Sequence, residues 1–105
     1  MTVVRVEAGV CGFVTDIEVQ KRDKQHMDVR VLTKCDMIAA WAEELGVINW
    51  MENLKSMKHS FIFQCASSHI RHAACPVPVA LLKAVEVEAG LALAADVTIS
   101  FLEHP

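Results

Sequence analysis

The feature that most constrains the fold is a change in the spacing of apolar residues near residue 34. Before it, apolar and polar side chains alternate, as they do in strands that bury one face. After it, apolar residues recur every three or four positions, as they do on one side of a helix. This order predicts an α+β fold, in which a sheet formed first along the chain is covered by helices.

Three strands are predicted in the first third of the chain, over residues 2–8, 13–20 and 26–33. They are joined by short segments, among them the charged loop 21–25, so we expect an antiparallel meander. A last strand is predicted over residues 96–102, where Val, Ile and Phe alternate with Thr and Ser.

The middle of the chain predicts helices. Gly46 is placed to end the first of them, residues 48–57 predict a second, shorter one, and two prolines open a third over 79–89. Residues 59–74 fit either a strand or a helix. The first helix carries an apolar stripe formed by Ile38, Trp41, Ala42, Leu45 and Ile48. The predicted order is β-β-β-α-α-β, an antiparallel sheet of about four strands with helices packed on one face.

Size and charge narrow the function classes. A chain of 105 residues predicts a single domain spanning 1–105. Ten basic residues against thirteen acidic ones give a net charge of −3, with no basic stripe, which disfavours a nucleic-acid partner. The sequence lacks the basic amphipathic helix that binds a membrane surface, so membrane binding is not predicted. There is no Gly-rich phosphate loop and no G-x-S-x-G element, so enzymatic activity is not favoured.

The hydrophobic content of 53% exceeds the ~45–50% of an average soluble chain. No apolar run approaches the ~18–20 residues that a membrane-spanning helix needs. We therefore expect the surplus to cover a homo-oligomer interface, along the stripe of the first helix continued by Met51 and Leu54. The N-terminus lacks the apolar region of a secretory signal, which predicts a cytoplasmic protein with reduced thiols.

The four cysteines, Cys11, Cys35, Cys65 and Cys75, do not form C-x-x-C pairs. Cys11 follows the first predicted strand and Cys35 the third, and these two strands run parallel in a meander, so both thiols belong at one edge of the sheet. Cys75 precedes a helix whose start can lie at the same end. Three thiols are thus expected to converge. Each cysteine taken singly is as well explained as a small core residue, Cys65 most of all.

Metal ligands are also spaced closely in Cys65-x3-His69-x2-His72-x2-Cys75. On a helix the first three would share a face. Thiolate and imidazole are ligands that zinc prefers, whereas an iron–sulfur cluster takes cysteines almost exclusively. The alternative is that both histidines are ordinary surface residues. The candidate metal ligands are Cys11, Cys35, Cys75, Cys65, His69 and His72.

Cys75-Pro76-Val77-Pro78 is the most specific local element. With Pro76 at the first helical position, Cys75 is expected at the N-cap. There the helix dipole and the Val77 N–H would stabilise a thiolate and lower its pKa below the ~8.5 of free cysteine. A rigid helix start with an inward-facing cysteine explains the element equally well.

Two resemblances follow from these residues. The Cys-Pro-Val-Pro helix start resembles that of the small bacterial sulfur-carrier family used in tRNA thiolation, which implies a persulfide on Cys75. Over Ala8–Phe13, Lys34–Asp36 and Cys75–Val97 the chain resembles a small uncharacterised family found chiefly in anaerobic bacteria and archaea. That resemblance implies a setting in which oxygen-sensitive thiols and clusters survive.

Three hypotheses result. The favoured one is a cysteine-based zinc- or iron–sulfur-binding module, because it uses several cysteines. A sulfur carrier with Cys75 as the persulfide-bearing nucleophile is the alternative, and it leaves three cysteines unexplained. The third is an assembly partner with no chemical site, which would make contact through the region of Trp41 and Trp50.

Overall fold

The structure is a computed structural model that describes residues 1–105. It contains four strands and four helices along the chain. Their bounds are β1 Thr2–Glu7, β2 Val14–Lys21, β3 His26–Leu32, α1 Asp36–Leu45, β4 Val47–Asn49, α2 Trp50–Asn53, α3 Phe61–His69 and α4 Val77–Glu88.

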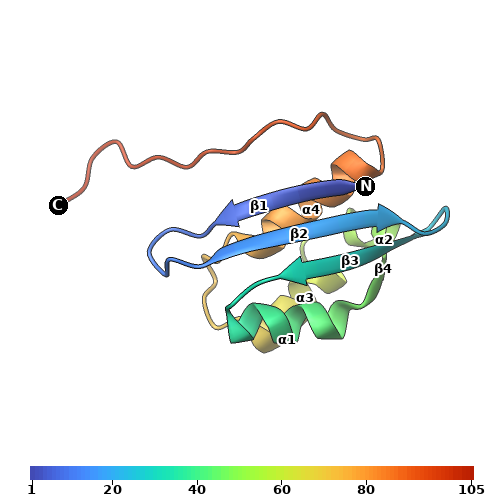
Figure 1. Cartoon of the computed structure of the whole chain (residues 1–105), viewed down its shortest axis with the longest axis horizontal. Helices are drawn as coiled ribbons and strands as arrows, with labels where there is room; N and C mark the ends of the chain where they lie inside the picture. The colour runs from blue at the N-terminus through green and yellow to red at the C-terminus, as the bar shows by residue number, and fades with distance from the viewer.

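The four strands form one sheet in the order β1-β2-β3-β4, and each neighbouring pair is antiparallel (Figure 1). The register places Val4 opposite Ile17, and Ile17 opposite Val31. These side chains form a row on one face of the sheet, as the alternation in the sequence predicts. The predicted meander is therefore confirmed.

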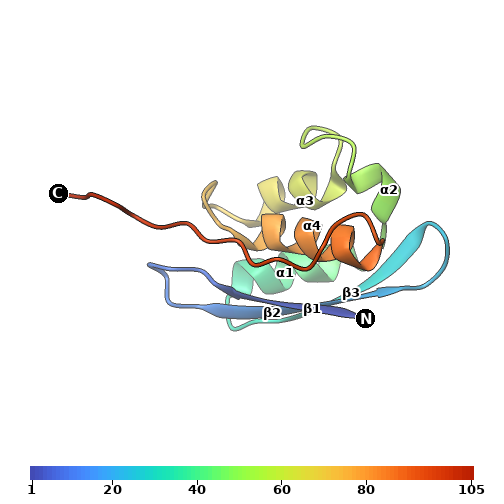
Figure 2. The same ribbon diagram turned by 90° about the horizontal axis from the view of Figure 1, so that it is seen from above.

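All four helices lie on the same side of the sheet (Figure 2). α4 packs on β1 and β2, α1 packs on β3, and α3 packs against α1 and α4. The predicted α+β class, with helices on one face of an antiparallel sheet, is confirmed. No helix of the chain is both long enough and apolar enough to span a membrane.

The apolar stripe of α1 lies inside the protein. Ile38, Trp41 and Leu45 are buried, and the indole Nε1 of Trp41 donates a hydrogen bond of 3.0 Å to the carbonyl oxygen of Ile62. Ile48, which the sequence places on the same stripe, is buried from β4 instead. The stripe is thus part of the core, and the prediction that these side chains form an oligomer interface is wrong. Met51 is exposed and Trp50 and Leu54 are half-buried, so a homo-oligomer, or a contact through the region of Trp50, stays a prediction.

The fourth strand is not the one that the sequence predicts. β4 pairs with β3 at the start of the stretch 48–57, which the sequence assigns to a helix. Only α2 is helical within that stretch. β4 has three residues, too few to show an alternating pattern, and Ile48 points inward under either spacing. The undecided stretch 59–74 contains α3, a helix.

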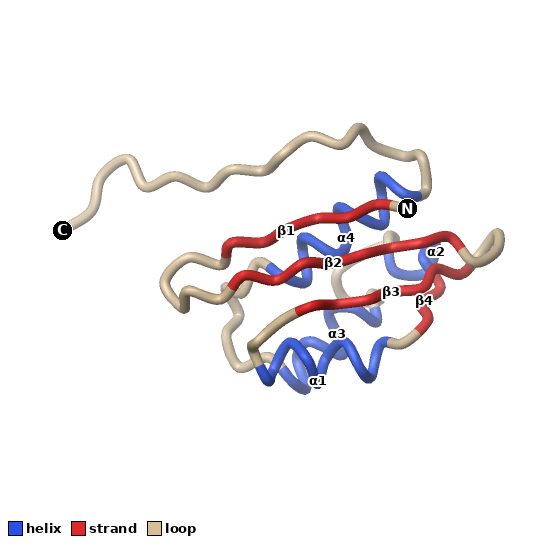
Figure 3. The backbone as a smooth tube through the Cα atoms, viewed as in Figure 1, coloured by secondary structure: helices blue, strands red, loops and turns tan.

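Residues 91–105 contain no helix or strand, so the predicted strand 96–102 is wrong. The segment leaves the end of α4 and passes along the β1 side of the molecule as extended chain (Figures 1 and 3). No backbone hydrogen bond joins it to β1, which stays an unpaired edge strand of the sheet. Its apolar side chains are exposed, with Ile99 84% and Phe101 85% accessible. Because no strand pairs with this segment, its alternating apolar side chains are not packed into the core.

Candidate functional site

One cavity of the protein has a volume of about 260 Å³ and is lined by Cys11, Cys35 and Cys75 together with His72. It lies at the end of the sheet where β1 and β3 finish. Its other lining residues are mostly apolar, among them Phe13 and side chains from the starts of α1 and α4. Three of the four cysteines therefore meet at one place, as the meander predicts.

The first thiol comes from the loop between β1 and β2. Gly9 and Gly12 have φ of 91° and 75°, a conformation that strains residues with a side chain. The Gly12 N–H donates a hydrogen bond of 2.9 Å to the Gly9 carbonyl oxygen, which closes the turn. Cys11 is exposed on this turn. The two glycines thus allow the chain to reverse while carrying a thiol to the mouth of the cavity.

The second thiol stands at the N-cap of α1. The Cys35 N–H donates a hydrogen bond of 3.1 Å to Thr33 Oγ1, which lies 2.9 Å from the hydroxyl of buried Thr15. These contacts tie the start of α1 to β2. Cys35 itself is half-buried, and its side chain makes no capping hydrogen bond. Its sulfur is therefore available at the positive end of a ten-residue helix.

The third thiol, on Cys75, lies one residue before the N-cap of α4, which is Pro76, so the predicted N-cap is off by one position. Cys75 is half-buried. Burial raises its pKa, which outweighs the lowering by the Val77 N–H, and the charges that Cys35 and Cys11 can carry raise it further. The prediction of an acidic Cys75 is therefore wrong, because the apolar cavity removes water that would stabilise the thiolate.

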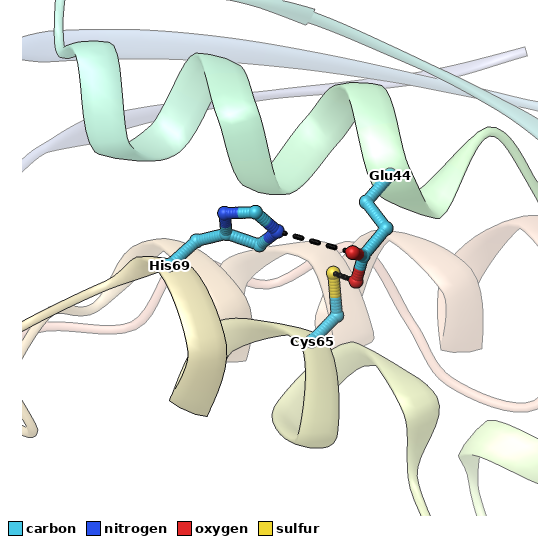
Figure 4. Close-up of side chains that lie close together, drawn as sticks. All are labelled: Glu44, Cys65 and His69. Carbon is cyan, nitrogen blue, oxygen red and sulfur yellow. Dashed lines mark hydrogen bonds and ion pairs between the residues drawn. The ribbon is translucent and has the colours of Figure 1, made fainter.

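Cys65 does not reach this cavity. It forms a separate group with Glu44 and His69 between α1 and α3 (Figure 4). Cys65 Sγ lies 2.9 Å from Glu44 Oε2, and His69 Nε2 lies 3.3 Å from Glu44 Oε1. Burial and the adjacent carboxylate raise the pKa of Cys65 to about 12. The hydrogen bond from Cys65 lowers the pKa of Glu44, and the adjacent imidazole of His69 lowers it further.

The predicted ligand face on one helix is thus split between two sites. α3 ends at His69, so Cys65 and His69 share a face, but His72 lies in the following loop and lines the cysteine cavity. Glu44 is the residue that the sequence did not single out. It comes from α1, 21 positions before Cys65, and no local spacing connects the two.

The two groups differ in how closely their atoms lie. Among all Cys, His, Asp and Glu side chains, only Glu44, Cys65 and His69 bring three ligand atoms within 4.8 Å of one another. The three sulfurs of the cavity are not all within that distance of one another. The cavity can therefore accept a larger group, whereas the second group matches a single ion.

Comparison with known proteins gives one match. A model of a family described as "Family of unknown function (DUF6951)" matches residues 2–101. No curated protein and no solved structure matches the chain. The match agrees with the predicted resemblance to a small uncharacterised family, and it extends from β1 into the C-terminal segment.

Proposed function

The chain belongs to this family of unknown function, and we propose that it is a metal-binding module whose cofactor is an iron–sulfur cluster. Cys11, Cys35 and Cys75 would hold the cluster, with His72 as the fourth ligand. The observation that carries the proposal is the single cavity, into which three separate segments of the chain bring three thiols and one imidazole.

The spacing of the thiols favours a cluster over a single zinc ion. With a Zn–S bond of about 2.3 Å, tetrahedral geometry puts two sulfurs about 3.8 Å apart. The three sulfurs of the cavity are not all within 4.8 Å of one another. A cluster spans a wider arrangement, because several irons and bridging sulfides lie between its ligands. The cavity volume of about 260 Å³ also exceeds what one ion requires.

The electrostatics of the cavity favour a cationic occupant. Thiolate charges on Cys11, Cys35 and Cys75 repel one another, and the apolar lining leaves them poorly solvated. Iron would neutralise these charges and displace the thiol protons. The remaining negative charge of such a site would face the starts of α1 and α4, where two helix dipoles favour it. A reducing cytoplasm is the proposed setting, since thiols stay reduced there.

A sulfur carrier is the second candidate. The Val77 N–H supports it, since this group lowers the pKa of Cys75 and would also stabilise a persulfide anion. It uses one thiol only and leaves Cys11 and Cys35 beside it without a role. The raised pKa of Cys75 also opposes a nucleophile, which must be a thiolate to react.

The test is metal and sulfide analysis of protein purified without oxygen, across the single Cys→Ser variants. We expect a brown protein with iron and inorganic sulfide, and loss of both in Cys11→Ser, Cys35→Ser and Cys75→Ser. Cys65→Ser is the matched control, because it makes the same change outside the cavity, and it should keep the cluster.

The other outcomes separate the alternatives. Stoichiometric zinc without sulfide, lost in the same three variants, would identify a zinc site in place of the cluster. A metal-free protein in which only Cys75→Ser abolishes persulfide loading would identify a sulfur carrier. Iron retained in all three cavity variants would refute the proposal.

A further inference from the structure

We propose that Glu44, Cys65 and His69 form a second metal site, distinct from the cysteine cavity, which binds one divalent cation of the zinc type. The site shares no residue with the proposed cluster site. It lies between α1 and α3, and the first site lies at the end of the sheet.

The three side chains come from two packed helices and point at one another (Figure 4). Cys65 and His69 are four positions apart on α3, so they project from the same face one turn apart. Glu44 projects from α1 opposite them. Helix–helix packing, with Trp41 bonded to the Ile62 carbonyl oxygen, fixes the distance between the two sides. The ligand atoms are therefore gathered before any ion binds.

One atom of the group is unsatisfied. The Nε2 of His69 is buried but has no hydrogen bond of acceptable geometry, although Glu44 Oε1 lies 3.3 Å away. A buried polar atom without a partner is costly, and native proteins rarely leave one. A cation between the imidazole, the carboxylate and the thiol would supply the missing interaction.

The ligand types match zinc. Thiolate, imidazole and carboxylate are its three protein ligands, and an open zinc site adds a water molecule to three of them. With zinc bond lengths of about 2.0–2.3 Å, neighbouring ligand atoms lie about 3.3–3.8 Å apart. The Nε2–Oε1 distance of 3.3 Å already fits. The Glu44 side chain is 50% exposed, so the fourth position can face solvent.

Binding would change one contact. Cys65 Sγ lies 2.9 Å from Glu44 Oε2, and the thiol proton lies between them. The cation replaces this proton, which goes to solvent, and sulfur and oxygen then move apart to tetrahedral spacing. Neither oxidation nor reduction is involved. Binding should therefore weaken at low pH, where protons compete for the sulfur and the imidazole.

The test uses the triple variant Cys11→Ser, Cys35→Ser, Cys75→Ser, in which Cys65 is the only thiol. Titration with Co²⁺ should give one equivalent of tetrahedral Co²⁺ with a thiolate-to-metal charge-transfer band, and Zn²⁺ should displace it. In the same background, His69→Ala and Glu44→Gln should each weaken binding by at least about 10–100-fold. His59→Ala and Glu43→Gln are the controls, because these exposed residues lie outside both proposed sites, and neither should change binding.

Any of three results would overturn the proposal. They are absence of binding in the folded triple variant, a Co²⁺ spectrum without the thiolate band, and equal affinity after His69→Ala. Circular dichroism checks that each variant is folded. Should the triple variant not fold, the chain with its native cysteines replaces it, with Zn²⁺ expected to protect Cys65 from alkylation after mild unfolding and not to do so after His69→Ala. If this second site does not bind Co²⁺ but the cysteine cavity still binds a cluster, the proposed function stands and only this inference fails. If the second site binds Co²⁺ but the cavity binds no cluster, this inference stands and the proposed function fails.

Discussion

Replacing Asn53 by alanine should destabilise the protein more than any other single change outside the apolar core. Asn53 is 4% exposed, and its side chain makes three hydrogen bonds. Its Oδ1 accepts from the Ser60 hydroxyl at 3.0 Å and from the Ile62 N–H at 2.8 Å, and its Nδ2 donates to the Asn49 carbonyl oxygen at 2.8 Å. This amide therefore holds the start of α3, the helix that carries Cys65 and His69.

The expected loss follows from the partners left behind. The Ile62 N–H and the Ser60 hydroxyl would stay buried without an acceptor, and the Asn49 carbonyl would lose its donor. At about 1–1.5 kcal/mol for each buried bond, Asn53→Ala should lower the free energy of unfolding by roughly 3–4 kcal/mol. That is a large share of the ~5–15 kcal/mol by which a domain is stable, and it corresponds to a fall in Tm of roughly 12–25 °C.

Urea unfolding measures this loss through the fluorescence of Trp41, which is fully buried beside Ile62. Asn49→Ala is the matched control, because Asn49 Oδ1 caps α2 with one exposed hydrogen bond of 3.2 Å to the Glu52 N–H. It should cost only about 1 kcal/mol. A loss below about 1 kcal/mol for Asn53→Ala, or one equal to that of Asn49→Ala, would show that Asn53 does not anchor α3.

Three further outcomes are expected. Burial would raise the pKa of Glu88, but hydrogen bonds from the Lys21 N–H and the Thr2 hydroxyl leave it below its usual 4.5. Its contribution to stability is therefore present above the unfolded pKa and is lost as pH falls through the folded pKa. Urea unfolding of Glu88→Gln should show a stability deficit at pH 7 that shrinks as the pH is lowered below 4.5, and a deficit independent of pH would contradict this. In the metal-free protein, Cys75 should alkylate more slowly than the same thiol in an unfolded peptide at pH 8, because its pKa is raised, and an equal or faster rate would be evidence against that burial effect. Removing residues 96–105 should change the free energy of unfolding by less than about 0.5 kcal/mol, since no side chain there is buried, and a larger loss would show that the segment pairs with a sheet edge.

Local sequence patterns predicted most of the regular structure. β1, β2 and β3 follow directly from alternation, and α1 and α4 from helical spacing together with Gly46 and the paired prolines. The wrong predictions concern segments whose structure depends on whether a neighbouring strand is available to pair with them. β4 is a strand because β3 offers it an edge, and residues 96–102 alternate but pair with nothing.

The convergence of Cys11, Cys35 and Cys75 was within reach of the sequence, because strand direction in a meander decides which strand ends share an edge. The pKa of Cys75 could not be predicted in the same way. The sequence contains the helix start that lowers a thiol pKa, but burial raises it more, and burial depends on side chains brought from the other end of the chain.

The sequence by itself thus determined the first three strands, the principal helices and the edge at which three thiols gather, because these depend on periodicity and on chain direction. Only the tertiary structure decided that Cys65 leaves the other cysteines and joins Glu44 and His69, and that the Trp41 stripe is core rather than interface. Both depend on how α1 and α3 pack, and the contact between two helices is fixed by side chains 21 positions apart, which no local pattern records.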